Sequence, residues 1–205
     1  MIDIADQLKA IHREVNAGSD ETIGVLLRRT YAATAADVWD AVTDPDRLKR
    51  WFLPVSGDLR EGGGFQVEGN ASGEILTCAP SKLLRVTWGA PTSVVELRLT
   101  EDDDERTTVE LEHIVPKAMA GSGAGALYVG PGWDGALLGL ALYVAGEVGD
   151  DFDPVAAANA PETQRFNAGS IDAWAAAVVA SGTATADELA AAVAMAKGQY
   201  TPDVD

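Results

Sequence analysis

The chain has 205 residues, of which 47% are hydrophobic and 23% charged, and its formal net charge is −17. This length is typical of one folded domain with an appendage. The 32 acidic side chains outnumber the 15 Lys and Arg side chains, so the charge disfavours binding to nucleic acids and to anionic membrane surfaces. The single cysteine, Cys78, excludes an intramolecular disulfide, as is typical of a reducing compartment.

The first residues do not resemble a secretory signal, because residues 1–6 carry acids where such a signal has a basic flank. The longest apolar stretch, residues 136–145, is far shorter than the roughly 20 residues that span a bilayer. We therefore expect a cytoplasmic protein that does not insert into a membrane.

Three helices and one strand are expected in the first quarter of the chain. Residues 3–16 carry apolar side chains at helical spacing and predict an amphipathic helix. Residues 22–31 have apolar side chains at alternate positions, with both faces partly apolar, and predict a strand. Thr34 predicts the start of a second helix, with Asp37 three residues on to accept from the free amides of the first turn. Asp44-Pro45 predicts a third, short helix, with Asp44 as its cap.

Five further strands are expected from the alternation of apolar and polar residues. In the last of them, Val109, Leu111 and His113 share one face, opposite Glu110 and Glu112. One apolar and one polar face per strand is typical of an antiparallel sheet that is packed on one side and solvated on the other. The five strands are expected at residues 65–69, 73–79, 82–89, 93–100 and 106–115.

The rest of the chain is expected to be helical after one loop. Residues 117–132 are rich in Gly, Ala and Ser and predict a loop, either a lid over a site or a flexible connection. Residues 133–147 predict a helix that is apolar around most of its girth and must be covered on most sides. Residues 161–180 and 185–198 predict two Ala-rich helices.

This order of elements predicts an α+β fold in which a curved antiparallel sheet surrounds one long C-terminal helix and encloses a cavity. The sheet supplies the cover that such an apolar helix needs. Residues 1–18 are expected to form an N-terminal helix, residues 19–149 the cavity domain, and residues 150–205 an Ala-rich helical extension.

Five segments match a known family in order. They are residues 29–45 (RTYAATAADVWDAVTDP), 48–54 (LKRWFLP), 57–65 (GDLREGGGF), 80–88 (PSKLLRVTW) and the pair Gly132-Trp133. Over residues 22–148 the chain resembles the SRPBCC superfamily of START-like, birch-pollen-allergen-like proteins, and within it the activator of Hsp90 ATPase homologues. The resemblance implies the helix-grip fold. It implies function less closely, because this fold hosts carriers, cyclases, hydratases and co-chaperones.

The candidate site is the lining of the cavity that the resemblance implies. The sequence has no Gly-x-Ser-x-Gly elbow and no Cys-x-x-Cys pair, and we predict no catalytic residue, no cofactor and no metal site. The elements that surround the cavity in the resembled fold carry large apolar side chains, which either bind a ligand or pack as core. The residues expected to bind the ligand are Trp51, Phe52, Phe65, Trp88, Leu97, His113, Trp133, Leu137 and Leu140.

His113 has two interpretations, because it shares a strand face with apolar residues and should point inward. It is either a core histidine bonded to a carbonyl or hydroxyl, or a polar anchor or general acid/base in the cavity.

Non-catalytic binding of a small hydrophobic molecule, such as a lipid or a polyketide-like compound, is the function that the sequence favours. One alternative is a cyclase- or hydratase-type enzyme that uses the same cavity, with His113 and Arg29 as its polar groups. Another is a co-chaperone that stimulates an Hsp90-type ATPase, as the family name implies. Among partners we expect no nucleic acid, and a homodimer through the Ala-rich extension stays an open alternative, as does the identity of the ligand.

Overall fold

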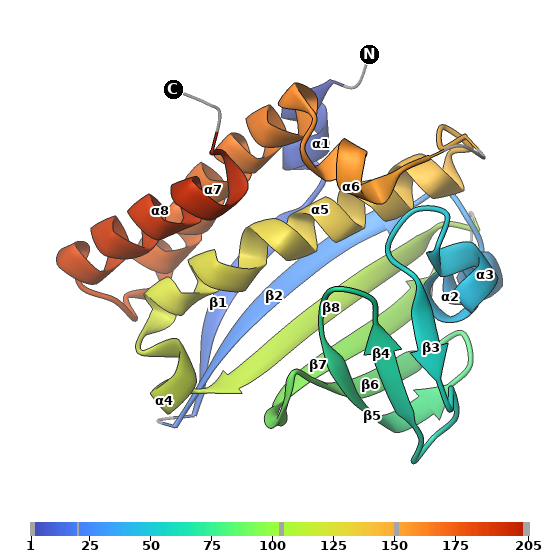
Figure 1. Cartoon of the computed structure of the whole chain (residues 1–205). Coiled ribbons are helices and arrows are strands. Elements are labelled where there is room, and N and C mark those ends of the chain that lie inside the picture. Colours follow the sequence, from blue (N-terminus) through green and yellow to red (C-terminus); the bar gives the residue numbers. More distant parts are fainter. Residues whose placement is uncertain (1–2, 20, 103–104, 150–151, 203–205) are drawn as a thin grey trace. The chain divides into compact units, whose positions relative to one another are not determined.

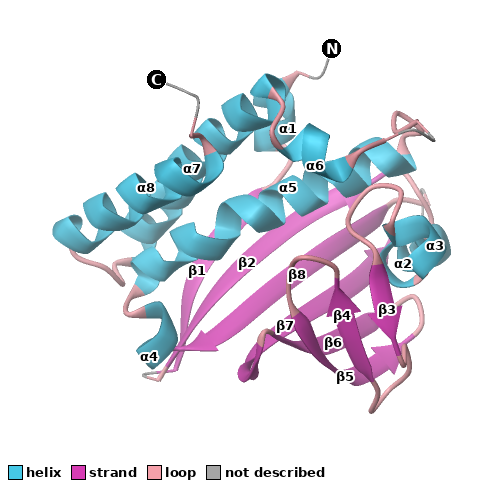
Figure 2. Ribbon diagram, in the orientation of Figure 1, coloured by secondary structure: helices cyan, strands magenta, loops and turns pink. Residues whose placement is uncertain are grey.

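The computed structural model describes residues 3–19, 21–102, 105–149 and 152–202. Its strands form an eight-stranded antiparallel sheet in the order β1-β2-β8-β7-β6-β5-β4-β3, and α5 (Ala126–Val144) is the long helix (Figure 1, Figure 2). This is the predicted α+β helix-grip fold. The strands are β1 (His12–Ser19), β2 (Thr22–Tyr31), β3 (Val55–Gly57), β4 (Gly64–Val67), β5 (Ser72–Ala79), β6 (Leu83–Trp88), β7 (Ala90–Glu101) and β8 (Thr107–Pro116).

Helix starts follow the capping signals in the sequence. The Thr34 hydroxyl accepts a hydrogen bond from the amide of Asp37 at 3.3 Å, and the Asp44 carboxylate accepts one from the amide of Asp46 at 2.8 Å. Both predicted helix starts are therefore confirmed. The remaining helices are α1 (Ile4–Lys9), α2 (Ala35–Thr43), α3 (Pro45–Leu48), α4 (Lys117–Ala120), the 3-10 helix η1 (Gly123–Gly125), α6 (Pro154–Ala158), α7 (Pro161–Ser181) and α8 (Ala186–Tyr200).

The chain divides into two compact units. Unit 1 comprises Met1–Leu27, Ile114–Leu138 and Val155–Asp205, and unit 2 comprises Arg28–His113 and Gly139–Pro154. Strands β2 and β8 and helix α5 each contribute to both units. The domain limits after residues 18 and 149 stay predictions.

The sheet of unit 2 has one apolar and one charged face, as the alternation predicts. On the charged face Arg28 pairs with Glu110, and Arg98 lies 3.5 Å from the same carboxylate. The alternate residues of β7 and β8 point to the other side, which we call the apolar face. Its residues on these two strands are Ser93, Val95, Leu97, Leu99, Thr107, Val109, Leu111 and His113.

The prediction of one helix over residues 3–16 is wrong beyond Ala10. Helix α1 ends at Lys9, and β1 begins at His12. Ile11 and Val15 are both buried and lie four residues apart. A spacing of four fits one face of a helix, but being even it also fits one face of a strand, so the apolar pattern alone did not distinguish the two.

The prediction of a loop over residues 117–132 is also wrong. This segment contains α4, η1 and the first turns of α5, which begins at Ala126 rather than at residue 133. The prediction was wrong because the segment is rich in glycine, which usually marks turns and loops. Gly130 instead permits close packing within unit 1, since a Cβ there would lie 2.4 Å from the indole of Trp174.

Helices α7 and α8, which the sequence predicted at residues 161–180 and 185–198, belong to unit 1. Helix α7 contacts β1, α1 and α8. Its Phe166, Ile171 and Trp174 side chains are at most 1% exposed. The C-terminal extension therefore supplies much of the hydrophobic core of unit 1. The sequence did not predict β1, β3 or α6.

Candidate functional site

The nine predicted ligand-binding residues are divided between the units. Trp133 and Leu137 belong to unit 1, and the other seven belong to unit 2. Their function as one lining stays a prediction.

A buried polar pair lies on the apolar face of unit 2. The Ser93 Oγ and His113 Nε2 atoms are 2.8 Å apart, and the two residues are 3% and 5% exposed. Burial lowers the pKa of His113 to about 4, so the imidazole is neutral at pH 7. The inward direction predicted for His113 agrees with this burial, and its hydroxyl partner is Ser93.

Ser93 was not among the predicted site residues. One feature of the sequence could have indicated it. Ser93 lies two and four residues before Val95 and Leu97, so it is a small polar residue in a series of alternate positions that is otherwise apolar. The register of β6 and β7 shifts here, because Thr87 pairs with Val94 whereas Trp88 pairs with Ala90. Pro91, Thr92 and Ser93 are therefore extra residues on β7. Such bulges turn side chains to new directions and are frequent beside functional sites.

An aromatic pair lies at the same end of the apolar face. The ring centroids of Phe65 and Trp88 are 5.9 Å apart at an interplanar angle of 38°. Phe65 is buried, whereas Trp88 is half-buried. Phe65 pairs in register with Gly73, where a Cβ would lie 1.9 Å from the Thr87 carbonyl oxygen and 2.8 Å from the Phe65 ring. Because Gly73 has no Cβ, β5 can lie close to the Thr87 carbonyl group of β6 and to the Phe65 ring.

Trp51 is a packing residue. Its Nε1 donates to the Ala41 carbonyl oxygen at 3.0 Å, and its ring stacks on Tyr143 with a centroid distance of 6.4 Å. A Cβ at Gly139 would lie 3.1 Å from the Trp51 carbonyl oxygen, so this part of α5 packs tightly on Trp51. Phe52 is half-buried beside it, with ring centroids 5.6 Å apart. Leu140, at 2% exposure, is also core.

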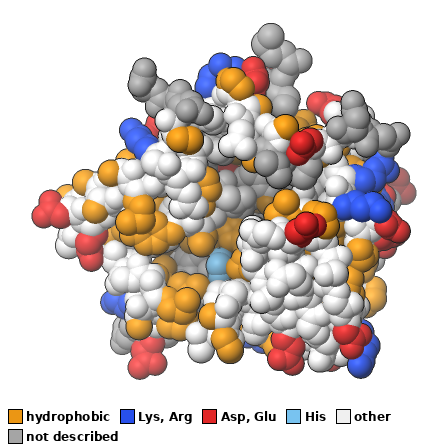
Figure 3. Space-filling view, viewed as in Figure 1, with side chains coloured by type: hydrophobic (Ala, Val, Ile, Leu, Met, Phe, Trp, Pro, Cys, Tyr) orange, Lys and Arg blue, Asp and Glu red, His pale blue; other side chains and the backbone are white. Residues whose placement is uncertain are grey.

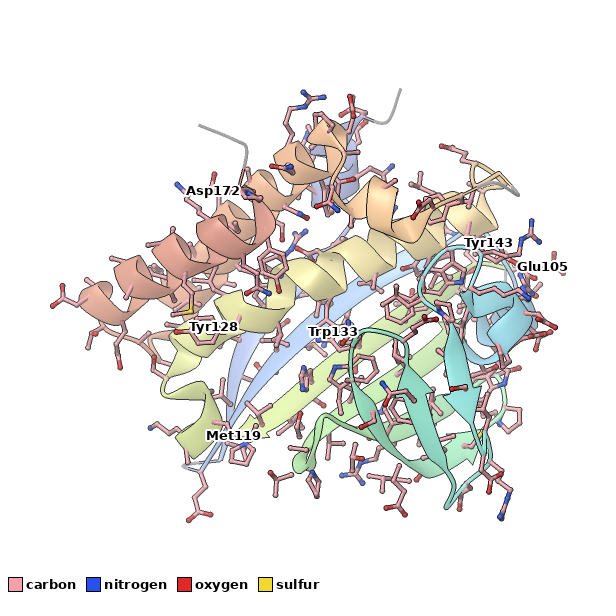
Figure 4. The ribbon with its side chains drawn as sticks, in the orientation of Figure 1. Glu105, Met119, Tyr128, Trp133, Tyr143 and Asp172 are labelled. Atoms are coloured by element: carbon pink, nitrogen blue, oxygen red, sulfur yellow. The ribbon has the colours of Figure 1, made fainter. Side chains whose placement is uncertain are left out.

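Two arginines contact Tyr143, which lies near the end of α5 and is labelled in Figure 4. Arg47 Nε donates to the Tyr143 hydroxyl at 3.0 Å, and its guanidinium lies 5.3 Å from the ring centroid. The Arg50 guanidinium lies 5.5 Å from the same centroid. Arg47 also pairs with Asp37 at 2.8 Å. These contacts fasten α5 to the region of α2 and α3 within unit 2.

Arg29 is a buried cation on the apolar face. Because Arg28 bonds Glu110 and Thr30 bonds Thr108 on the charged face, Arg29 lies opposite Val109 and points to the other side. It is 7% exposed, and its guanidinium lies 5.6 Å from the Tyr31 ring centroid. On β8, Val109 is four residues from His113, which is roughly 13 Å along a strand.

Unit 1 has a buried polar cluster that the sequence did not predict. Asp134 on α5 is fully buried and accepts hydrogen bonds from Arg13 Nε at 2.8 Å, from Trp174 Nε1 at 3.1 Å and from the Ser170 hydroxyl. Burial raises the pKa of Asp134, while Arg13 and the other donors oppose this rise. This carboxylate links its own helix α5 to β1 and α7, and is suited to holding these three elements together rather than to chemistry.

The described residues support neither a metal site nor a membrane-spanning helix. Among the described ranges 3–19, 21–102, 105–149 and 152–202, His, Cys, Asp and Glu side chains form no cluster of three or more that could hold a metal ion. None of the helices in that part of the chain is both long and apolar enough to span a membrane.

The family model for activator of Hsp90 ATPase homolog 1-like protein matches residues 32–145, more than half of the chain. The chain belongs to this family. The family lies in the SRPBCC superfamily, so the resemblance inferred from the sequence is confirmed. No curated protein matches the chain.

Solved structures extend the likeness beyond that region. The crystal structure of CalU16 from Micromonospora echinospora is 38% identical, with a TM-score of 0.63 over 82% of this chain and 96% of CalU16. Its solution NMR structure gives a TM-score of 0.66 over 84% and 94% of the two chains, also at 38% identity. DynU16, a protein in the dynemicin biosynthetic locus, is 25% identical, with a TM-score of 0.54 over 61% of this chain and 48% of DynU16. Because CalU16 covers more than the family model does, it shares part of the chain outside residues 32–145.

Proposed function

We propose that this family member binds a small hydrophobic molecule, lipid-like or polyketide-like, without catalysing a reaction on it. The ligand would contact the apolar face of unit 2, in the internal cavity that the sequence predicts. The observation that carries the proposal is the presence, on one face of the sheet, of half-buried Leu97 and of the buried Ser93–His113 pair, with half-buried Trp88 at the end of that face. Small-molecule sites are mostly apolar and contain a few placed polar groups.

The family and its structures support the same proposal. The helix-grip fold hosts carriers of hydrophobic compounds, as the resemblance implies. DynU16 belongs to a biosynthetic locus, and a ligand in this chain would accord with a role beside the synthesis of small molecules.

An enzyme in the same place is the second candidate. The low pKa of His113 leaves its imidazole neutral at pH 7, which is the form that takes a proton as a general base. Chemical conversion of a bound molecule, absent in a His113→Gln variant, would favour the enzyme over the carrier.

Stimulation of an Hsp90-type ATPase is the third candidate and rests on the family name alone. Figure 3 shows acidic side chains in several separate places on the visible surface rather than in one patch. An ATPase assay with purified Hsp90-type chaperone tests this candidate, and a rate unchanged by the protein would remove it.

Binding is tested by titrating the full chain with Nile red, an uncharged dye whose emission shifts to the blue in apolar surroundings. We expect saturable binding at one site. Leu97→Gln, which places an amide on the apolar face, should weaken binding about tenfold, as expected from an unpaired buried polar group. Arg98→Gln, on the next residue of β7 but on the charged face, is the matched control and should bind as the original protein does. Equal binding by all three proteins would contradict the assignment of the face, and no binding by any of them would contradict the proposed function.

A further inference from the structure

We infer that the Ser93–His113 pair is the anchor for one uncharged oxygen group, a hydroxyl or a carbonyl, of the hydrophobic ligand. This inference rests on the proposed function and names the chemical class of the ligand. It also assigns a function to Ser93.

The first step is the position of the pair beside the aromatic side chains. Val86 and Val95 are partners in register, and both are buried. Two residues further along each strand lie Trp88 on β6 and, toward the start of β7, Ser93. Trp88 and Ser93 each adjoin the last regular pair, Thr87 with Val94, so both lie at the end of the ladder where the register shifts. The hydrogen bond to His113 places the Ser93 side chain on the apolar face. The Phe65 ring extends this group, because it contacts Trp88.

The second step is the capacity of the pair for hydrogen bonds. A serine hydroxyl has one donor hydrogen and two acceptor lone pairs, and the bond to His113 Nε2 uses one of these three. If the imidazole donates, the Ser93 hydroxyl can donate to a carbonyl. If Ser93 donates, its lone pairs can accept from a hydroxyl. Either arrangement serves an uncharged oxygen group next to an apolar body that lies against Phe65 and Trp88.

The third step is the charge of the pair. Burial lowers the pKa of His113 to about 4, so Ser93 and His113 together carry no charge near pH 7. A carboxylate placed there would lose its water without gaining a counter-charge, which is unfavourable. The buried cation on this face is Arg29, and it lies roughly 13 Å along the strand from His113. A carboxylate ligand would therefore be expected at Arg29 and an alcohol or ketone at Ser93.

The position of Ser93 in the bulge also fits an anchor. The residues Pro91, Thr92 and Ser93 interrupt the ladder at the register shift between Thr87 and Trp88. A regular strand would serve packing equally well, whereas a bulge re-directs one side chain. Here that side chain is the hydroxyl that meets His113.

The test uses four ten-carbon compounds that differ at one end: 1-decanol, 2-decanone, decanoate and 1-chlorodecane. Each displaces Nile red from the full chain at pH 7.5. We expect decanol and decanone to compete at concentrations about fivefold lower than chlorodecane and decanoate, as one net hydrogen bond predicts. Ser93→Ala should bring decanol and decanone to the level of chlorodecane and leave chlorodecane unchanged.

Three further variants keep the outcome decisive. Ser93→Thr retains a hydroxyl and should retain the preference, even if Ser93→Ala proves too unstable to assay. His113→Gln should reduce the preference. Ser56→Ala, at an exposed serine of β3, is the matched control and should change nothing.

Each outcome bears on a different claim. Nile red binding without a preference for the alcohol and ketone, or with a preference that survives Ser93→Ala, would overturn the anchor and leave the proposed function standing. A preference for decanoate would also overturn it and would favour Arg29. Failure to bind Nile red and all four compounds would overturn both the anchor and the proposed function.

Discussion

Asp134 of α5 and Arg13 of β1 form a buried ion pair in unit 1, with Arg13 Nε 2.8 Å from Asp134 Oδ2. The two side chains are 0% and 7% exposed. Ser170 and Trp174 of α7 donate to the same oxygen, so one carboxylate joins a strand, the long helix and the C-terminal extension. The extension is thereby tied to the half of α5 that lies in unit 1.

Asp134→Asn should destabilise the protein by about 3 kcal/mol, because it leaves the Arg13 charge buried without its counter-charge. The measurement is chemical denaturation followed by circular dichroism. Asp172→Asn, on the exposed side of α7 (Figure 4), is the control and should change the free energy of unfolding by less than about 0.5 kcal/mol. Equal effects of the two substitutions would show that the buried pair contributes no more than a surface acid.

Two glycines of α5 should respond to alanine with opposite sign. Gly→Ala in a helix interior ordinarily stabilises by up to about 1 kcal/mol. Gly135 has open space where a Cβ would be placed, so Gly135→Ala should raise the melting temperature. At Gly130 the Cβ would lie 2.4 Å from Trp174, and overpacking of this kind costs about 1–3 kcal/mol. Thermal unfolding of both variants checks this, and an increase in stability for Gly130→Ala would contradict the close packing of α5 and α7.

His113 should make the stability of the protein depend on pH. Its pKa in the folded state is about 4, against the ordinary value of 6.5 expected in the unfolded chain. Between these values the unfolded chain binds more protons, so its contribution to stability is complete above pH 6.5 and is lost as the pH falls toward 4. The slope is at most about 1.4 kcal/mol per pH unit. Denaturation from pH 4 to 7.5 should show this slope in the original protein and a smaller one in His113→Gln; identical slopes would contradict a neutral, buried His113.

Much of the fold follows from local patterns. The sequence pattern predicts the existence of the strands from β4 to β8, and the alternation in β7 and β8 predicts the two faces of the sheet. The caps at Thr34 and Asp44 predict the starts of α2 and α3. These features depend on neighbours in sequence, which is why the sequence reveals them.

The parts of the fold that the sequence predicted wrongly, or did not predict, depend on contacts between residues that are far apart in the chain. The Ile11 and Val15 spacing suits both helix and strand, and only the tertiary packing of β1 decides between them. The glycines before residue 133 are typical of a loop. The reason for glycine at position 130 is a tertiary contact, because the Trp174 ring occupies the space beside it. Asp134 and Arg13 are 121 residues apart, and no local pattern connects them.

The sequence predicted the orientation of one candidate residue, while the ligand site as a whole stays a prediction. The inward direction of His113 followed from alternation with Val109 and Leu111. Its partner Ser93 lies at a register shift, which alternation alone does not reveal. Trp51 and Leu140 were expected at the ligand. Both are buried, Trp51 bonds the Ala41 carbonyl oxygen, and their contact with a ligand stays a prediction.

Two-dimensional NMR of the nitrogen-15-labelled full chain, titrated with 2-decanone, tests the central claim most directly. The account predicts saturable shifts of the backbone amides of Phe65, Trp88, Ser93 and His113, with the amides of α8 unchanged. An unchanged spectrum, or shifts confined to α7 and α8, would contradict a hydrophobic ligand site on the apolar face of unit 2.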